Sequence, residues 1–252
     1  MRSVPRTLTV VGLLAAVVGT AAMPVPAYAA DREQIDVVLD ISNSMGESDG
    51  GDGTKIEAAQ RAVHTAVKAL PDGTHLGLRT FAGCKHSDQV VPIGPLDRSR
   101  VDKAVDEVEL AGDTPLTYAL EQAANDFHGS GHKSVLLISD GEETCGGDPV
   151  AAARALAAKC VDVRVDVIGF RVDEDTKEQL RQVAAAGCGE YLDASDAAAL
   201  DKLVKRVSLR AAGNDRPLLL WFGAAAVALV LLAALVVGAL LLRRRRRPRP
   251  TW

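Results

Sequence analysis

Short apolar runs alternate with longer amphipathic segments along most of the chain, and this alternation constrains the fold more than any other feature. Short apolar runs predict buried strands, and longer periodic segments predict helices. Strands separated by helices form a mostly parallel sheet covered on both faces, so the sequence predicts a doubly wound α/β fold. The expected strands are Ile35–Asp40, Leu76–Phe81, Gln89–Ile93, Ser134–Ser139, Val161–Phe170 and Glu190–Leu192, and the expected helices are Lys55–Leu70, Val101–Leu110, Leu116–Phe127, Pro149–Lys159, Glu174–Ala186 and Asp196–Arg210.

The third strand has a position in the sheet that the sequence itself predicts. Pro92 lies within it. Proline has no backbone N–H, so it cannot complete the hydrogen bonds that a central strand makes with both neighbours. This strand is therefore expected at an edge of the sheet.

Residues 1–29 have the features of a secretory signal peptide. Arg2 and Arg6 precede a short apolar run over 8–22, and residues 27–29 form an A-x-A cleavage signal. The alternative is an N-terminal anchor helix, which the glycine and prolines of this segment disfavour. The mature chain is expected to begin at residue 30.

A second apolar segment, 218–242, contains no charged residue. As a helix it would be about 37 Å long, enough to cross a hydrocarbon core about 30 Å thick. Arginines crowd the tail 243–252, which the positive-inside rule places in the cytoplasm. We therefore expect a single-pass plasma-membrane protein with an extracellular domain over 30–212 and a linker over 213–217. The glycines and alanines of segment 218–242 would also allow this transmembrane helix to pack on a partner helix.

The exported part is acidic. Neither terminal segment contains Asp or Glu, and together they hold 8 of the 29 Lys and Arg, which leaves 33 acidic against 21 basic residues between them. Such a domain repels nucleic acid, so no nucleic-acid partner is expected, and it raises the local concentration of cations. All four cysteines lie in this part, where disulfides are the usual state.

Three oxygen-bearing side chains follow one another where the first expected strand ends. Asp40, Ser42 and Ser44 occupy alternate positions in the sequence D-I-S-N-S. A carboxylate with two hydroxyls suits Mg²⁺ or Mn²⁺, whereas zinc prefers nitrogen and sulfur ligands. The alternative is structural, with Asp40 as a cap and the serines as turn formers. Three protein ligands would leave coordination positions open for water or a partner's oxygen.

Two later motifs extend this pattern. Thr114 lies in the sequence G-D-T-P-L, and Asp140 follows the apolar run L-L-I-S. Each has a structural alternative, because Thr114 could cap the next helix and Asp140 with the glycine after it could form a strand-exit turn. Together with Asp40-x-Ser42-x-Ser44, however, they resemble the von Willebrand factor A (VWA) domain with its metal-ion-dependent adhesion site (MIDAS). This resemblance covers nearly all of the exported part.

The resemblance implies the Rossmann-like VWA fold and a role for each motif residue. Ser42, Ser44 and Thr114 would offer hydroxyl oxygens to the ion. Asp40 and Asp140 would act mainly through coordinated water. The remaining position would accept an acidic side chain from a protein partner, and Mg²⁺ or Mn²⁺ is expected rather than Ca²⁺ because few direct carboxylates leave the ion electrophilic.

On this fold the cysteines fall into two groups. Cys84 and Cys145 each follow a strand and would lie on the metal side of the sheet, whereas Cys160 and Cys188 each precede a strand on the opposite side. We therefore predict the disulfides Cys84–Cys145 and Cys160–Cys188. The first would connect two loops beside the metal.

Three classes of function remain to be weighed. The leading prediction is a cell-adhesion or ligand-binding module rather than an enzyme. A metal-assisted hydrolase would need a second metal or a nearby general base, and Glu142 and Glu143 are near enough to serve as that base. The third class is a metal-independent assembly component of the membrane.

The acidic loop 47–53 beside the motif could hold a second cation, but a solvated loop is the simpler interpretation.

Overall fold

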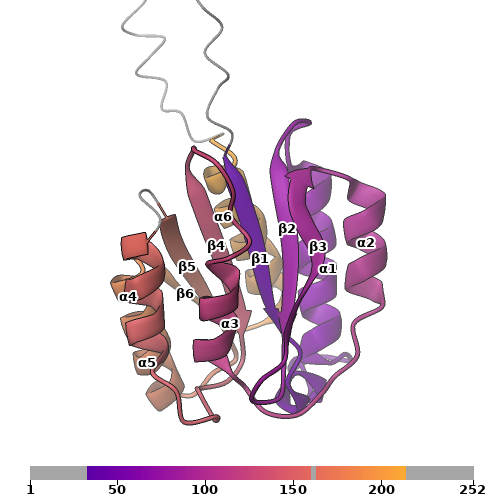
Figure 1. Cartoon of the computed structure of the whole chain (residues 1–252). Coiled ribbons are helices and arrows are strands. Elements are labelled where there is room, and N and C mark those ends of the chain that lie inside the picture. Colours follow the sequence, from indigo (N-terminus) through magenta and orange to yellow (C-terminus); the bar gives the residue numbers. More distant parts are fainter. Residues whose placement is uncertain (1–32, 160–162, 214–252) are drawn as a thin grey trace, which may run out of the picture. The chain divides into compact units, whose positions relative to one another are not determined.

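The computed structural model describes residues 33–159 and 163–213, which contain one six-stranded sheet in the order β3-β2-β1-β4-β5-β6 (Figure 1). The predicted doubly wound, mostly parallel sheet with flanking helices is confirmed. The strands are β1 (Gln34–Asp40), β2 (His75–Phe81), β3 (Ser87–Pro95), β4 (Lys133–Ser139), β5 (Val163–Phe170) and β6 (Tyr191–Ala194). The helices are α1 (Lys55–Ala69), α2 (Arg98–Asp106), α3 (Leu116–Ala123), α4 (Pro149–Lys159), α5 (Glu174–Ala186) and α6 (Ala197–Ala211), with a 3-10 turn, η1 (Asn43–Gly46), after β1.

The order of the strands reverses beside β1. This strand pairs in parallel with β2 on one side and with β4 on the other. Among the named strands of the described residues, only β2 and β3 pair antiparallel. In open α/β sheets, ligands bind beyond the carboxyl ends of the strands at such a reversal. The register pairs Leu39 with Ile138, so Asp40 at the end of β1 lies next to Ser139 at the end of β4.

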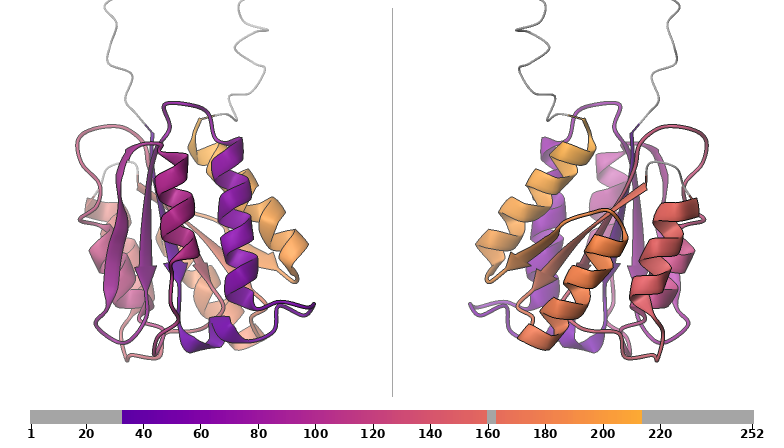
Figure 2. Two further views of the ribbon diagram at one scale, coloured as in Figure 1. Left: turned by 90° about the vertical axis from the view of Figure 1, so that its right-hand side faces the viewer. Right: turned by 90° about the vertical axis from the view of Figure 1, so that its left-hand side faces the viewer.

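Two apolar layers bury the faces of the sheet. Helices α1, α2 and α6 cover one face, and α3, α4 and α5 cover the other (Figure 2). The strands β1 and β4 contribute side chains to both layers, with Leu39 facing one and Val38 facing the other. Burial on both faces explains why these strands are nearly continuous apolar runs in the sequence.

The edge position predicted for the proline-containing strand is confirmed in β3. Leu76 pairs with Gly94 and Leu78 pairs with Val91, so β3 has one residue more than β2 between these pairs. Pro92 lies in this bulge. The missing N–H therefore removes no hydrogen bond from a regular ladder.

Two helices, α2 and α3, differ from their predicted ranges by more than one residue, because polar side chains decide where they begin and end. The carboxylate of Asp97 accepts a hydrogen bond from the backbone N–H of Arg100, so α2 begins earlier than predicted. The helix ends before Leu110, whose side chain is 39% exposed. Helix α3 ends at Ala123 rather than Phe127, because Asp126 leaves the helix to pair with Arg79 of β2.

Several predicted segments lie outside the described residues: the signal peptide 1–29, residues 214–217 of the linker, the transmembrane helix 218–242 and the tail 243–252. No helix within 33–159 and 163–213 combines the length and apolar character needed to cross a membrane. The first and last described residues, Glu33 and Gly213, lie against each other at the amino ends of the strands (Figure 1). They are therefore at the opposite end of the domain from Asp40.

Candidate metal-ion site

The D-x-S-x-S segment forms a compact turn at the carboxyl end of β1. Asp40 is fully buried, and its Oδ1 accepts a hydrogen bond of 2.8 Å from the backbone N–H of Ser42. The chain then enters η1, and the Ser44 hydroxyl oxygen lies 3.1 Å from that of Ser42. Asp40 and the serines thus do form a turn, as the structural alternative proposed. This turn brings the two hydroxyls together, so it is compatible with a metal site.

Asp140, directly after the end of β4, lies at the same place. The Ser44 hydroxyl donates a hydrogen bond of 2.8 Å to Oδ1 of Asp140, a contact between residues 96 positions apart. The two hydroxyls and the Asp140 carboxylate therefore meet at one place. Hydroxyl and carboxylate oxygens are the kind of ligand that a small, hard divalent cation takes.

Thr114 reaches the same cluster from the loop before α3. It does not cap that helix with its side chain, since the capping position is Pro115 and no side-chain cap is present. A Cβ placed on Gly141 would lie 3.2 Å from the Thr114 hydroxyl oxygen and 3.9 Å from that of Ser44. The Thr114 hydroxyl therefore lies beside the Asp140–Gly141 turn, at the edge of the sheet where the other four predicted side chains meet.

The loop that carries Thr114 is held from both sides. On one side, its backbone N–H donates 2.8 Å to the Thr144 hydroxyl, and its carbonyl accepts 3.1 Å from the Thr144 N–H. On the other, Gly83 N–H donates 2.8 Å to the carbonyl of Asp113, and Gly112 packs so closely on Gly83 that a side chain there would clash. The position of Thr114 thus depends on two other loops.

Burial controls the electrostatics of Asp40. It raises the pKa of this carboxyl to about 7, while hydrogen bonds from Ser139 and Ser42 act in the opposite direction. The Ser139 hydroxyl donates 2.5 Å to Oδ2 of Asp40. Ser139 was not predicted as a site residue, although it directly precedes Asp140 in the sequence and could have been inferred from that position.

Lys55 is a second residue that the sequence analysis missed. Its ammonium group donates 2.7 Å to Oδ2 of Asp140 and 2.9 Å to Oε2 of Glu47. The lysine side chain is 8% exposed and the Asp140 side chain is fully buried. No local sequence signal identifies this pair, because 85 residues separate its members.

Two of the remaining acidic candidates, Glu143 and Asp49, have structural partners, whereas Glu142 is exposed. Both carboxylate oxygens of Glu143 accept backbone N–H groups, one from Thr117 in the first turn of α3 and one from Cys145. In the acidic loop 47–53, Asp49 is buried and accepts hydrogen bonds from Gly51 N–H and from the Arg61 guanidinium. These contacts assign Glu143 and Asp49 to holding their loops.

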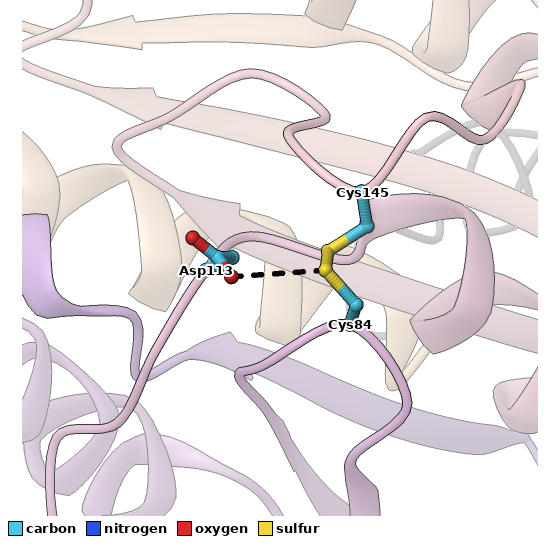
Figure 3. A group of neighbouring side chains, drawn as sticks. All are labelled: Cys84, Asp113 and Cys145. Atoms are coloured by element: carbon cyan, nitrogen blue, oxygen red, sulfur yellow. Dashed lines mark hydrogen bonds between the residues drawn. A yellow bond between two sulfur atoms is a disulfide. The ribbon is translucent and has the colours of Figure 1, made fainter.

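The predicted Cys84–Cys145 disulfide is present and connects the loop after β2 to the loop after β4 (Figure 3). The Asp113 carboxylate lies beside it, 3.7 Å from the Cys84 sulfur. A bonded sulfur has no proton to donate and no free thiolate, so this trio is not a cation site while the disulfide is intact. The second predicted bond, Cys160–Cys188, stays a prediction: Cys188 is exposed and unbonded, and Cys160 lies outside the described residues.

Comparison with known proteins agrees with this architecture. A family model described as the von Willebrand factor type A domain matches residues 36–143, which include all five predicted site residues. The uncharacterized protein YwmD of Bacillus subtilis (strain 168) is 34% identical over 206 residues, covering 75% of this chain and 89% of YwmD.

Solved structures share the fold at lower identity. An aerotolerance-related membrane protein from Bacteroides fragilis NCTC 9343 has a TM-score of 0.59 at 21% identity, with 70% of this chain and 98% of that chain covered. Proximal thread matrix protein 1 from the mussel byssus, with a zinc-occupied MIDAS motif, has a TM-score of 0.58 at 19% identity, with 73% and 46% covered.

Proposed function

Because the chain belongs to the von Willebrand factor type A domain family, we propose that it is a membrane-anchored binding module outside the cell. It holds a divalent cation at a MIDAS formed by Asp40, Ser42, Ser44, Thr114 and Asp140. Through that cation it binds an acidic side chain of a protein partner. Its role is adhesion or ligand binding rather than catalysis.

One observation carries the proposal. Oxygen atoms from three separate segments meet at the carboxyl edge of the sheet, with the Ser44 hydroxyl 3.1 Å from the Ser42 hydroxyl and 2.8 Å from Asp140. Hydroxyls outnumber the carboxylates in this set. A bound divalent ion there would supply an electrophilic coordination position to an incoming carboxylate.

The choice of ion follows from these ligands. Mg²⁺ and Mn²⁺ accept a small, octahedral oxygen set that retains water, whereas Ca²⁺ usually takes six to eight oxygens at longer distances. We therefore propose Mg²⁺ or Mn²⁺. Zinc belongs in the test as well, because the mussel byssus protein is described with zinc in its MIDAS motif.

The membrane anchor is supported by the sequence and by one structural relative. The apolar segment 218–242 is long enough to span a bilayer, and the Bacteroides fragilis protein is described as a membrane protein. Gly213 lies against Glu33, which precedes β1, and is therefore at the opposite end of the domain from the site. A chain continuing from there into a membrane would leave the site accessible to a partner.

A binding role is also supported by the surroundings of the site. The carboxylate of Glu143, a candidate base for a metal-assisted hydrolase, already accepts two backbone hydrogen bonds. Both of its oxygens therefore already bind backbone donors, which leaves this carboxylate poorly placed to activate a water molecule.

Thermal unfolding of the purified full chain tests the metal site. A cation that binds only the folded state raises the melting temperature by mass action. We expect an increase with Mg²⁺ or Mn²⁺ over EDTA, a smaller one with Ca²⁺, and none with either ion in Thr114→Val. Thr117→Val is the matched control, since it removes a buried hydroxyl that lies against Gly147 and has no hydrogen-bond partner among the described residues. An equal shift in the wild type and Thr114→Val would contradict the proposal.

The acidic ligand is tested on the Mn²⁺-loaded chain. Acetate, but not the neutral acetamide, should displace coordinated water and lower the paramagnetic relaxation of water protons. No difference between the two would reject carboxylate binding and leave only a structural cation.

A further inference from the structure

Lys55 occupies a position that local physics disfavours. It is the first residue of α1, where the partial positive charge of the helix end opposes a cation. Its side chain is also almost completely buried, which is rare for lysine unless it is paired. The start of the helix does not need it, because Thr54 and Glu57 form a complete capping box. A residue that breaks local rules in this way points to a role in the site.

Asp140 is the partner that holds this ammonium group in place. Both Asp140 and Glu47 bind it, but the Glu47 side chain is 68% exposed and therefore well screened by solvent. The ammonium group thus lies between two carboxylates, 2.7 Å from Asp140 and 2.9 Å from Glu47. It places a positive charge directly against one of the two buried carboxylates of the site.

We propose that Lys55 determines the specificity of this site: its fixed ammonium weakens the binding of the divalent cation and strengthens the binding of an anionic ligand to that cation. This inference rests on the proposed metal site. Without Lys55, Asp40 and Asp140 would fully neutralise a divalent ion. With it, the loaded site keeps one net positive charge, which attracts an incoming carboxylate.

The alternative is that Lys55 only orients Asp140. The second oxygen of Asp140 is already bound by the Ser44 hydroxyl at 2.8 Å, so the carboxylate keeps one fixed partner when the lysine is removed. Removing the lysine also leaves a buried carboxylate without its counter-charge, and a bound cation would then relieve that cost. Both effects predict tighter cation binding by a neutral variant, whereas a purely orienting lysine predicts weaker binding.

The test compares Lys55→Met with Lys55→Arg and Glu47→Gln in the purified full chain. Free Mn²⁺ is measured by its electron paramagnetic resonance signal, and acetate binding to the Mn²⁺-loaded chain by water-proton relaxation. We expect Lys55→Met to bind Mn²⁺ on the order of tenfold more tightly and acetate severalfold more weakly. Lys55→Arg keeps the charge and Glu47→Gln removes only an exposed partner, so both should stay within about twofold of the wild type.

Unchanged or weaker Mn²⁺ binding by Lys55→Met would overturn the inference, as would unchanged acetate binding. If Lys55→Met does not fold, Lys55→Gln removes the same charge, keeps a hydrogen-bond donor and carries the same expectation. A folded wild type that binds no Mn²⁺ would instead reject the proposed function itself, so the two failures are distinguishable.

Discussion

Asp36 and Asp40 lie four residues apart on β1 and are both fully buried, but their surroundings differ. Asp40 accepts a backbone N–H from Ser42 and a hydroxyl from Ser139. Neither oxygen of Asp36 has a donor among the described residues. Burial raises both pKa values, to about 7 at Asp40 and well above the ordinary value at Asp36, where the nearby Asp126 carboxylate adds to the effect.

The contrast follows from where each residue lies along the strand. At the end of β1 the chain turns, so free N–H and hydroxyl groups are available to stabilise an anion. In the middle of β1 the backbone groups belong to the sheet, and Asp126 already accepts two hydrogen bonds from Arg79 at 2.7 Å. A neutral Asp36 can donate to Asp126, so this carboxyl is stable in its protonated form. One strand thus carries one buried carboxyl group with hydrogen-bond donors and one that has none within the described part of the chain.

The largest expected effect separates the two residues by the same substitution. Asp40→Asn should lower Mn²⁺ affinity about 100-fold or more, since it removes a charge and a water-orienting oxygen from the site. Asp36→Asn should leave the affinity unchanged. Calorimetric titration of the two variants measures this, and a comparable loss in both would mean that the difference between the two positions has no bearing on cation binding.

The second prediction concerns the disulfide, which supports the loops around Asp40 and not the middle of the strand. Replacing Cys84 and Cys145 together by serine should cost about 2–4 kcal/mol of unfolding free energy in EDTA. It should also weaken Mn²⁺ binding, because the loops that position Thr114 are then no longer joined. Urea unfolding and Mn²⁺ titration measure both effects.

The wild type after thiol reduction is the control and should match the double variant. Lower stability with unaltered Mn²⁺ affinity would show that Thr114 keeps its place without the disulfide.

The third prediction uses the raised pKa of Asp36. The unfolded chain loses this proton near pH 4 and the folded chain only at higher pH, so this group makes the wild type less stable as pH rises through that interval. Asp36→Asn removes this slope and can donate its amide to Asp126. We expect a gain of about 1–3 kcal/mol at pH 7.5 and little gain at pH 4, measured by urea unfolding.

Asp126→Asn is the contrasting variant, since it breaks the buried pair with Arg79 and should destabilise the fold at neutral pH. If the unfolding free energies of Asp36→Asn and the wild type changed in parallel between pH 4 and 7.5, Asp36 would not bind the proton assigned to it.

Part of the site was predictable because its signals are local. The spacing of Asp40, Ser42 and Ser44 is written in five consecutive residues, and Asp140 ends a recognisable apolar run. Asp36 also stands in an apolar strand, but nothing in its neighbourhood reveals that Asp126 will lie beside it. Lys55 was missed for the same reason, since its position at the start of a helix looks like an ordinary exposed residue.

Periodicity and proline placement act over a few residues, so they were enough to predict the alternation of strands and helices, the mostly parallel sheet and its edge strand. Placing the cysteines on the resembled fold then gave the pair Cys84–Cys145. Which polar groups share a buried space could be seen only in the folded chain: Ser139 on Asp40, Lys55 on Asp140 and Asp126 beside Asp36. The cost of burying a charge depends on partners that the fold brings from distant positions, and no local pattern encodes them.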